Sequence, residues 1–153
     1  MSSKPQNNRK GRSKNFKIWQ QNVNKSKTCQ LDLIGSGRMV SEDIDVIALQ
    51  EPYISPNKTT VAARHWITIY PTTHETDASK TRSIILICSN LISDNWEQIN
   101  FHSGDVTAIR IRGNWGSLVL FNIYNDCTHN ETIRALTTFH SENRDYLLGK
   151  ENY

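Results

Sequence analysis

The sequence predicts an α/β (α+β) fold, in which a mixed sheet is flanked by helices. Apolar runs at 44–49 and 82–88 have the length of buried strands. Residues 105–112 and 117–124 flank a Gly-Asn turn signal, which is typical of a β-hairpin. A helical spacing of apolar residues follows at 131–148. Strands that occur both in succession and between helical stretches indicate a mixed sheet rather than an all-β fold.

The N-terminal half begins with a strand, a helix and a second strand. The segment "FKIWQQNV" (16–23) has strand character, and a helical pattern occupies 28–40. Gly35 and Gly37 each disfavour the interior of this helix by about 1 kcal/mol. The second strand, 44–49, runs directly into Gln-Glu-Pro. Because a helix joins the two strands, we expect them to run parallel in one sheet.

Several shorter elements follow the loop at 51–60. Four further strands are expected at 65–70, 82–88, 105–112 and 117–124, with a short one near 97–101. The continuous apolar run at 82–88 is typical of a strand that is covered on both faces.

The last element has the strongest helical pattern of the chain. Thr128 and Glu131 have the spacing of a capping box, which predicts a helix over 131–148. Leu136, Phe139 and Leu147 share one side of this helix and are expected to face the sheet.

The charge distribution is uneven along the 153 residues, whose formal net charge is +3. Eight of the 18 Lys and Arg residues precede Asp32, the first acidic residue. Residues 1–15 therefore form a basic tail that we expect to be disordered. A basic segment on an acidic body is compatible with nucleic-acid contact or nuclear import, and equally with a simple solvated tail.

Composition excludes several other classes of protein. No apolar run approaches the roughly 18 residues of a membrane span, and the N-terminus has no hydrophobic leader. The three cysteines have no paired spacing, so we expect reduced thiols and no zinc site. These observations favour an intracellular protein without membrane contact.

Polar side chains follow the first two strands at the point where each strand ends. Asn22 and Asn24 end the first, and Glu51 ends the second. In parallel strands these residues meet at one carboxyl edge, where open sheets place ligands. Carboxylate and amide oxygens suit Mg²⁺, which takes one or two protein carboxylates beside water and substrate phosphate. The alternative is a solvent-facing glutamate beside ordinary turn residues.

Four segments carry a resemblance to a known family. They are "IWQQNVNKS", "DVIALQEPYI", "TRSIILIC" and "FNIYND", with Glu51 29 residues after Asn22. From about Phe16 onward the chain resembles the endonuclease/exonuclease/phosphatase superfamily. More narrowly, it is similar to the apurinic-type endonuclease domain of fungal non-LTR retrotransposons.

The resemblance implies a four-layer α/β sandwich and Mg²⁺-dependent phosphodiester hydrolysis of DNA. Glu51 matches the metal-binding glutamate of the family, and Asn22 matches an asparagine that helps to hold the metal and its water. Tyr124 matches the active-site tyrosine, which supports the scissile phosphate. Asn24 and Asn125 fall where outer-shell roles are expected. The implied partners are DNA and the rest of a retroelement polyprotein, with no small-molecule cofactor.

Two segments of the family pattern are missing from the 153 residues. There is no Ser-Asp-His segment, which would supply the catalytic histidine, and no Gly-Asp-Phe-Asn segment beside the attacking water. The five histidines have no metal-ligand spacing. Residues 16–153 are thus expected to be the N-terminal portion of such a domain, truncated and inactive alone. We also expect the second sheet of the sandwich to be missing, which would leave an apolar face open.

Two alternatives to this expectation stay open. One is a phosphatase or other phosphodiesterase of the same superfamily. The other is a non-catalytic remnant or small binding module, which the missing catalytic segments favour.

Overall fold

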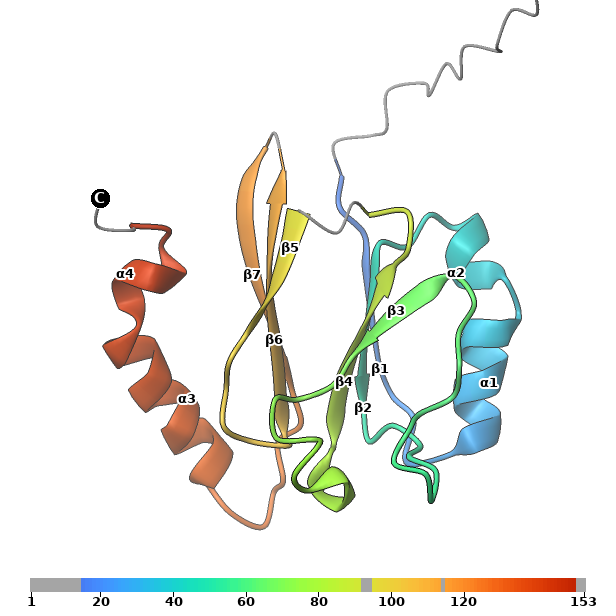
Figure 1. Cartoon of the computed structure of the whole chain (residues 1–153), viewed down its shortest axis with the longest axis horizontal. Helices are drawn as coiled ribbons and strands as arrows, with labels where there is room; N and C mark the ends of the chain where they lie inside the picture. The colour runs from blue at the N-terminus through green and yellow to red at the C-terminus, as the bar shows by residue number, and fades with distance from the viewer. Residues whose placement is uncertain (1–14, 92–94, 114, 151–153) are drawn as a thin grey trace, which may run out of the picture.

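The computed structural model describes residues 15–91, 95–113 and 115–150. Its elements form four layers in the order helix, sheet, sheet, helix, with α1 and α2 on one outer side and α3 and α4 on the other (Figure 1). The predicted α/β (α+β) class is therefore confirmed. The expected disordered tail lies outside the described residues except for Asn15, and so does Asn114 of the hairpin turn.

The first sheet is mixed, with the strand order β1-β2-β4-β3. β1 and β2 are parallel, and the two remaining pairings are antiparallel. The register places Asn22 opposite Gln50, so that the first two strands end side by side as expected. The four strands are β1 (Ile18–Asn22), β2 (Val46–Gln50), β3 (Trp66–Ile69) and β4 (Ser83–Cys88).

The connection from β1 to β2 differs from the predicted single helix over 28–40. It forms two helices, α1 (Lys27–Gly35) and α2 (Arg38–Ser41). Gly37 between them has a φ of 72°, a left-handed conformation that ends one helix axis before the next begins. The prediction of one continuous helix was wrong because the two glycines allow this break.

Strand β4 is buried along its whole length, as the apolar run predicts. Ile84, Leu86 and Cys88 belong to the apolar cluster on the side of α1 and α2. Ile85 and Ile87 belong to the cluster that faces the second sheet. The two sets alternate because successive side chains of a strand point to opposite faces.

A second sheet covers the first, which corrects the expectation of an open apolar face. It is an antiparallel meander of β5 (Trp96–Ile99), β6 (Val106–Gly113) and β7 (Gly116–Ile123). Ile109 and Ile111 of β6 pack against Ile85 and Ile87 of β4. The strands after β4 pair only with one another, so they form a separate layer instead of extending the first sheet.

A buried polar network joins the two sheets. Asn122 of β7 is 2% exposed, and its amide nitrogen donates to the carbonyls of Leu49 (2.9 Å) and Ile84 (2.7 Å) in the first sheet. Its amide oxygen accepts a hydrogen bond from Gln50. The Ser83 hydroxyl donates to the Asn122 carbonyl at 2.8 Å. Because unpaired buried polar groups are costly, these bonds favour one alignment of the sheets.

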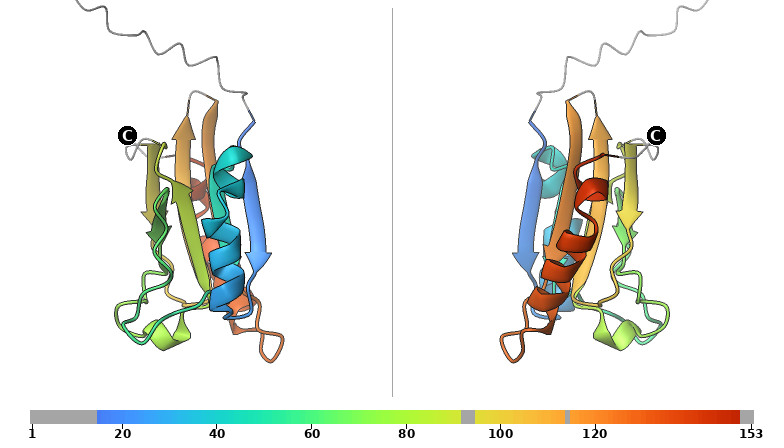
Figure 2. Two further views of the ribbon diagram at one scale, coloured as in Figure 1. Left: turned by 90° about the vertical axis from the view of Figure 1, so that its right-hand side faces the viewer. Right: turned by 90° about the vertical axis from the view of Figure 1, so that its left-hand side faces the viewer.

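The C-terminal helical region is divided where a single helix over 131–148 was predicted. It consists of α3 (Glu131–Glu142) and the short α4 (Arg144–Leu147). Phe139 of α3 packs against the rings of Phe101 (5.1 Å between centroids) and Phe121 (6.1 Å). Leu136 and Leu147 are half-buried, so this helical region faces the second sheet as expected (Figure 2).

The predicted capping box is absent from α3. Asn130 occupies the N-cap position, and the Thr128 hydroxyl donates instead to Oδ1 of Asp126 at 2.7 Å. The Thr128 N–H donates to the same oxygen at 3.0 Å. The prediction failed because Asp126 accepts the Thr128 N–H, which the Glu131 side chain would accept in a capping box. The Glu131 N–H donates instead to Nδ1 of His129 at 3.3 Å.

The structure also bears on the cysteines and on possible membrane-spanning helices. Cys29, Cys88 and Cys127 are free thiols. Within the described residues, no helix combines the length and apolar character that crossing a membrane requires.

Candidate functional site

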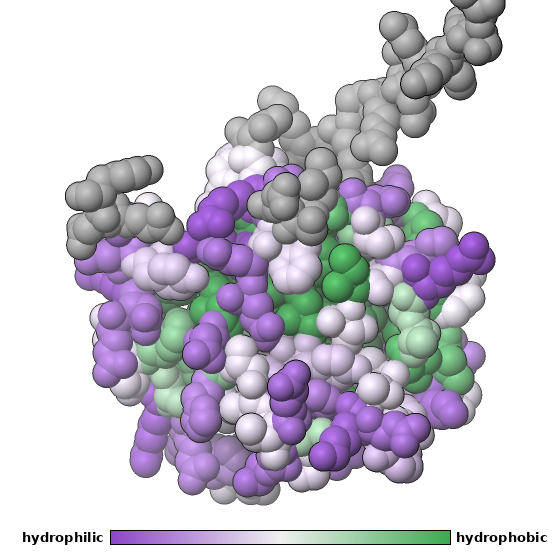
Figure 3. Space-filling model, in the orientation of Figure 1, coloured by the Kyte–Doolittle hydropathy of each residue, from purple (hydrophilic) through white to green (hydrophobic). Residues whose placement is uncertain are grey.

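The polar strand ends of both sheets meet at one edge of the sandwich. The Glu51 N–H donates to the Arg82 carbonyl at 2.8 Å, which places the end of β2 beside the start of β4. The Tyr124 N–H donates to the Asp105 carbonyl at 2.8 Å, just after β7 and before β6. In the orientation of Figure 1 this is the lower edge, where the molecular surface is predominantly hydrophilic (Figure 3).

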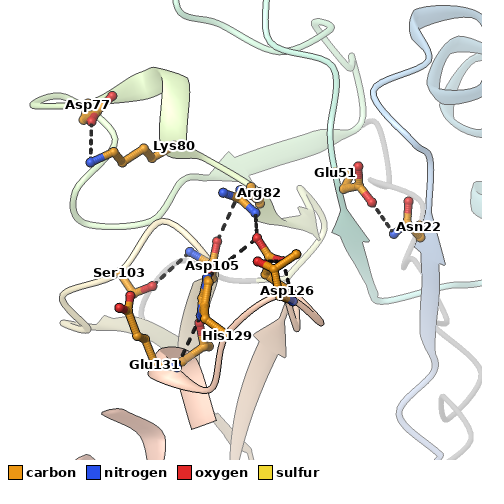
Figure 4. Close-up of polar contacts among 12 residues, drawn as sticks. Asn22, Glu51, Asp77, Lys80, Arg82, Ser103, Asp105, Asp126, His129 and Glu131 are labelled. Carbon is orange, nitrogen blue, oxygen red and sulfur yellow. Dashed lines mark hydrogen bonds and ion pairs between the residues drawn. The ribbon is translucent and has the colours of Figure 1, made fainter. Parts of the chain in front are cut away.

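Glu51 and Asn22 point toward each other across the ends of β1 and β2 (Figure 4). The Asn22 amide nitrogen donates to Oε1 of Glu51 at 3.0 Å. The Asn22 amide oxygen in turn accepts the Asn24 N–H at 2.8 Å. The expected juxtaposition of Asn22 and Glu51 is present, and it orients the Glu51 carboxylate. Their role as metal ligands stays a prediction.

The Glu51 backbone has a conformation that is uncommon for a residue with a side chain. Its φ is +48°, in the left-handed region, and its carbonyl accepts the Lys25 N–H at 2.7 Å. Such a conformation costs about 1–3 kcal/mol and is concentrated at functional positions. Pro52 then prevents further ladder pairing, so the chain turns away and leaves the carboxylate at the rim of the sheet.

The side-chain atoms of Glu51 and Asn22 that could meet a cation are oxygens, the donor type that a hard cation such as Mg²⁺ takes. Among the described residues, no group of three or more His, Cys, Asp or Glu is arranged to hold a metal ion. The donors at hand are oxygens of Glu51 and Asn22. Magnesium commonly takes one or two carboxylates and fills its octahedron with water and phosphate oxygens, so this sparse set is chemically sufficient.

Arg82 lies between Glu51 and the segment that follows β7. Its guanidinium carbon is 5.3 Å from the centre of the half-buried Tyr124 ring. Its Nη1 donates to Oδ2 of Asp126 at 2.6 Å, and its Nε is 3.6 Å from Oδ1 of Asp105 (Figure 4). Hydrogen bonding to Asp126 and the charge of Asp105 raise the pKa of Arg82 further. Arg82 thus links Glu51, through its backbone, to the Tyr124 ring.

Asp126 is engaged on both carboxylate oxygens. Hydrogen bonds from the side chain of Thr128 and from Arg82 hold the pKa of Asp126 well below its usual range. Nε2 of His129 lies 3.6 Å from Oδ2 of Asp126, an ion-pair distance when the imidazole is protonated. Because Oδ2 accepts a hydrogen bond from Arg82 and Oδ1 accepts one from Thr128, Asp126 is suited to holding Arg82 in place.

The two residues expected at outer-shell positions are both exposed. Asn24 has a left-handed φ of 49° and contacts Asn22 through its backbone N–H. Asn125 directly follows Tyr124, and its carbonyl accepts a weak hydrogen bond from the Cys127 thiol at 3.9 Å. Neither side chain contacts Glu51 in the described structure, and their outer-shell roles stay predictions.

Sequence reasoning missed Arg82 and Asp105 as site residues. Each was assigned to the start of an apolar strand, and a charged residue in that position is usually solvated. The sequence offered one weak indication that Arg82 and Asp105 belong to the site. Both directly precede strands that start at the edge of the sandwich where β2 ends. Only the antiparallel pairing of β4 with β2 brings Arg82 to Glu51.

Comparison with known proteins gives a match among solved structures but none among family models or curated proteins. Among solved structures, the fold is similar to the endonuclease domain of TRAS1, a telomere-specific non-LTR retrotransposon, with a TM-score of 0.61 and 14% sequence identity. The match covers 84% of this chain and 53% of that one, so the chain spans about half the length of the solved domain. At this identity the likeness shows an endonuclease-like fold.

Proposed function

We propose that the edge formed by Glu51, Asn22 and Tyr124 binds a divalent cation together with a DNA phosphodiester. In this proposal the site belongs to the Mg²⁺-dependent endonuclease type. The observation that carries the proposal is the convergence of an oriented carboxylate and a braced tyrosine at one edge of an endonuclease-like sandwich. The 153 residues alone bind without turnover.

Each residue has a distinct role in this proposal. The Glu51 carboxylate holds the cation, and Asn22 orients that carboxylate through its Oε1 hydrogen bond. The Tyr124 hydroxyl contacts a phosphate oxygen, and Arg82 holds the tyrosine ring in place. A bound magnesium ion would supply Lewis-acid stabilisation of negative charge on the phosphate and the leaving oxygen.

The absence of turnover follows from the state of the carboxylates near Tyr124. In-line attack needs a base for the water, and such help is typically worth 10²–10⁴ in rate. Asp126 is occupied by Arg82 and Thr128, and Asp105 accepts a hydrogen bond from Thr132 at 2.9 Å. A positioned donor that stabilises the transition state is worth roughly a further 10²–10³. Without both, at best a trace rate remains.

DNA is preferred over other phosphate esters for two reasons. The solved domain with the similar fold is an endonuclease domain of a retrotransposon. The sequence also carries an excess of Lys and Arg before Asp32, which favours a polyanionic partner. A phosphatase of the same fold would instead release inorganic phosphate from a monoester, and a binding module would bind DNA without a metal requirement.

The proposal is tested first by metal binding. Mn²⁺ titration of the purified chain, followed by electron paramagnetic resonance, should show one weak saturable site. The isosteric variant Glu51→Gln should weaken it by roughly tenfold or more. Glutamine keeps the size of the side chain and the backbone preference, so the two proteins differ in charge alone. Equal Mn²⁺ binding by both proteins would contradict a metal site at Glu51.

Nicking of supercoiled plasmid in Mg²⁺ tests the second part. We expect no nicking by the wild-type chain, whose folded state is checked by circular dichroism. Nicking that disappears in Glu51→Gln would show that the 153 residues do contain a base. Among the polar residues nearest to Tyr124 in the chain, His129 would be the first candidate, because Asp126 is held by Arg82 and Thr128.

A further inference from the structure

Two open grooves of similar size flank the segment 76–81, which forms a wall between them. One, the His102 groove of about 510 Å³, is lined by Lys80, Arg82, His102, Asp105, His129 and Thr132 among others. The other, the Tyr53 groove of about 590 Å³, is lined by Lys25, Tyr53, Ser55, Lys58, Ser79 and Thr81 among others. The two grooves are similar in size but differ in whether their positively charged side chains are paired with carboxylates.

The cations of the His102 groove are neutralised by neighbouring carboxylates. The Lys80 ammonium lies 3.4 Å from Oδ2 of Asp77. Arg82 is paired with both Asp105 and Asp126. A polyanion that entered this groove would have to compete with existing ion pairs, so it would gain little electrostatic free energy.

The cations of the Tyr53 groove are not engaged in this way. No ion pair recorded among the described residues involves the two lysines that line the groove, Lys25 and Lys58, or the nearby Lys27. All three side chains are exposed. The Lys27 ammonium lies 5.6 Å from the centre of the Tyr53 ring. The groove therefore combines available positive charge with an aromatic surface, a combination suited to a nucleic-acid strand.

The loop that forms the Tyr53 groove is held in one conformation from beneath. The fully buried side chain of Gln30 accepts the Tyr53 N–H at 2.9 Å and donates to the Thr60 hydroxyl at 2.6 Å. The ring of the buried His74 contacts the Lys58 carbonyl through Nε2 at 2.6 Å. These hydrogen bonds of the buried Gln30 amide and His74 imidazole fix the backbone of the loop at Tyr53 and Lys58. The groove therefore has its shape before any ligand binds.

The groove also adjoins the Glu51 site directly. The Lys25 N–H donates to the Glu51 carbonyl, and Pro52, which follows Glu51, lines the groove. A strand whose phosphate lies at Glu51 can therefore continue along the groove without leaving the surface.

We propose that the Tyr53 groove is the track along which a DNA strand continues from the Glu51 site. Lys25 and Lys58 contact backbone phosphates, and the Tyr53 ring packs against the sugar-phosphate chain. This inference rests on the proposed function for the choice of DNA, and it assigns which of the two grooves the strand occupies. Because the contacts are ammonium groups and one ring, recognition is independent of base sequence.

The test measures DNA binding by the full 153-residue chain in EDTA, so that it does not depend on any metal site. Fluorescence anisotropy with a short labelled duplex is recorded between about 50 and about 200 mM salt. Lys25→Gln and Lys58→Gln should each weaken binding severalfold and reduce the slope of log K against log salt by about 0.9. The double variant should reduce it by about twice that amount.

A matched control separates the groove from net charge. Arg134→Gln removes one positive charge from the exposed face of α3 and should leave both affinity and salt slope close to wild type. All variants alter exposed or half-buried side chains, and unchanged melting temperatures would confirm that they fold.

Two results would overturn the inference. If Lys25→Gln and Lys58→Gln bind DNA as the wild type does, the binding comes from elsewhere, including the basic segment 1–14. If Arg134→Gln weakens binding as much as the lysine variants do, net charge alone explains the effect. The proposed metal site at Glu51 is tested by a separate measurement. If that proposal is wrong, Glu51→Gln and the wild type bind Mn²⁺ equally.

Discussion

The strands on the Glu51 side of the candidate site and the strand on its Tyr124 side are packed to different extents. Every residue of β2 and β4 in the first sheet is buried. In β7 of the second sheet only Asn122 is buried, and in α3 only Thr132. An open apolar groove of about 450 Å³ lies beside the contact between α3 and β7 and is lined by Phe121, Ile123, Leu136 and Phe139 among others. The first sheet thus supplies most of the core, while the second carries Tyr124 on a thinner layer.

The two halves of the candidate site are therefore supported by differently packed parts of the structure. Glu51 projects from the densely packed sheet, where a strained φ can be maintained by the surrounding structure. Tyr124 follows the loosely covered strand β7 and is steadied by Arg82, which directly precedes β4 of the other sheet. We therefore expect changes in the first sheet to affect the whole fold, and changes in the second to affect mainly the Tyr124 side.

The largest expected effect comes from the core of the first sheet. Leu86→Ala should lower the free energy of unfolding by about 2–5 kcal/mol, because the side chain is fully buried and leaves a cavity. Leu136→Ala, at the half-buried groove beside β7, should cost about 1 kcal/mol. Urea denaturation of both variants under one condition measures the two losses. Equal losses of unfolding free energy would show that the two sites contribute equally to stability.

The next effect concerns the polar network between the sheets. Asn122→Ala should cost about 2–4 kcal/mol, since it leaves the Gln50 amide and two buried carbonyls without their partner. Gln98→Ala is the matched control, because its amide makes an exposed hydrogen bond to the Tyr70 carbonyl. That variant should lose only about 0.5 kcal/mol. A loss at Asn122 no greater than at Gln98 would contradict a stabilising role for the network.

A smaller effect is expected from the ion pair between Arg82 and Asp126. The folded-state pKa of Asp126 is depressed, so its contribution to stability is present above the unfolded pKa of about 3.9. That contribution is lost as the pH falls below about 4 and the carboxylate takes up a proton. Asp126→Asn should be less stable than wild type at neutral pH, and this difference should narrow on acidification. Chemical denaturation across the acid range measures it; a constant difference would count against the pairing.

The smallest effect is expected at Thr128, where the sequence predicted a cap worth about 1 kcal/mol. The structure places the Thr128 hydroxyl on Asp126 in an exposed bond, and the backbone N–H to the same oxygen remains in the variant. Thr128→Ala should therefore cost about 0.5 kcal/mol or less. Thermal unfolding checks this value. A loss of unfolding free energy near 2 kcal/mol would instead indicate that Thr128 caps α3.

Local patterns in the sequence were sufficient for the elements and for one half of the site. The apolar runs located β2 and β4, and the polar residues at two strand ends brought Asn22 and Glu51 together. Both predictions depend on features that act over a few residues: side-chain alternation, strand length and a proline that ends pairing. The helix bounds were less accurate, because Gly37 takes a left-handed conformation between α1 and α2. The Asn143 side chain also donates to the Phe139 carbonyl at 2.9 Å where α3 ends.

The tertiary structure alone decided which strands share a sheet and which charged residues reach Glu51. By itself the sequence determined that strands of this length exist, that two of them end in oxygen-bearing side chains, and that a helical segment follows the last hairpin. It did not determine that β5, β6 and β7 form a separate layer, or that Arg82, directly before the antiparallel β4, lies beside Glu51. Those choices depend on contacts between residues far apart in the chain, where burial of one face against another outweighs any local preference.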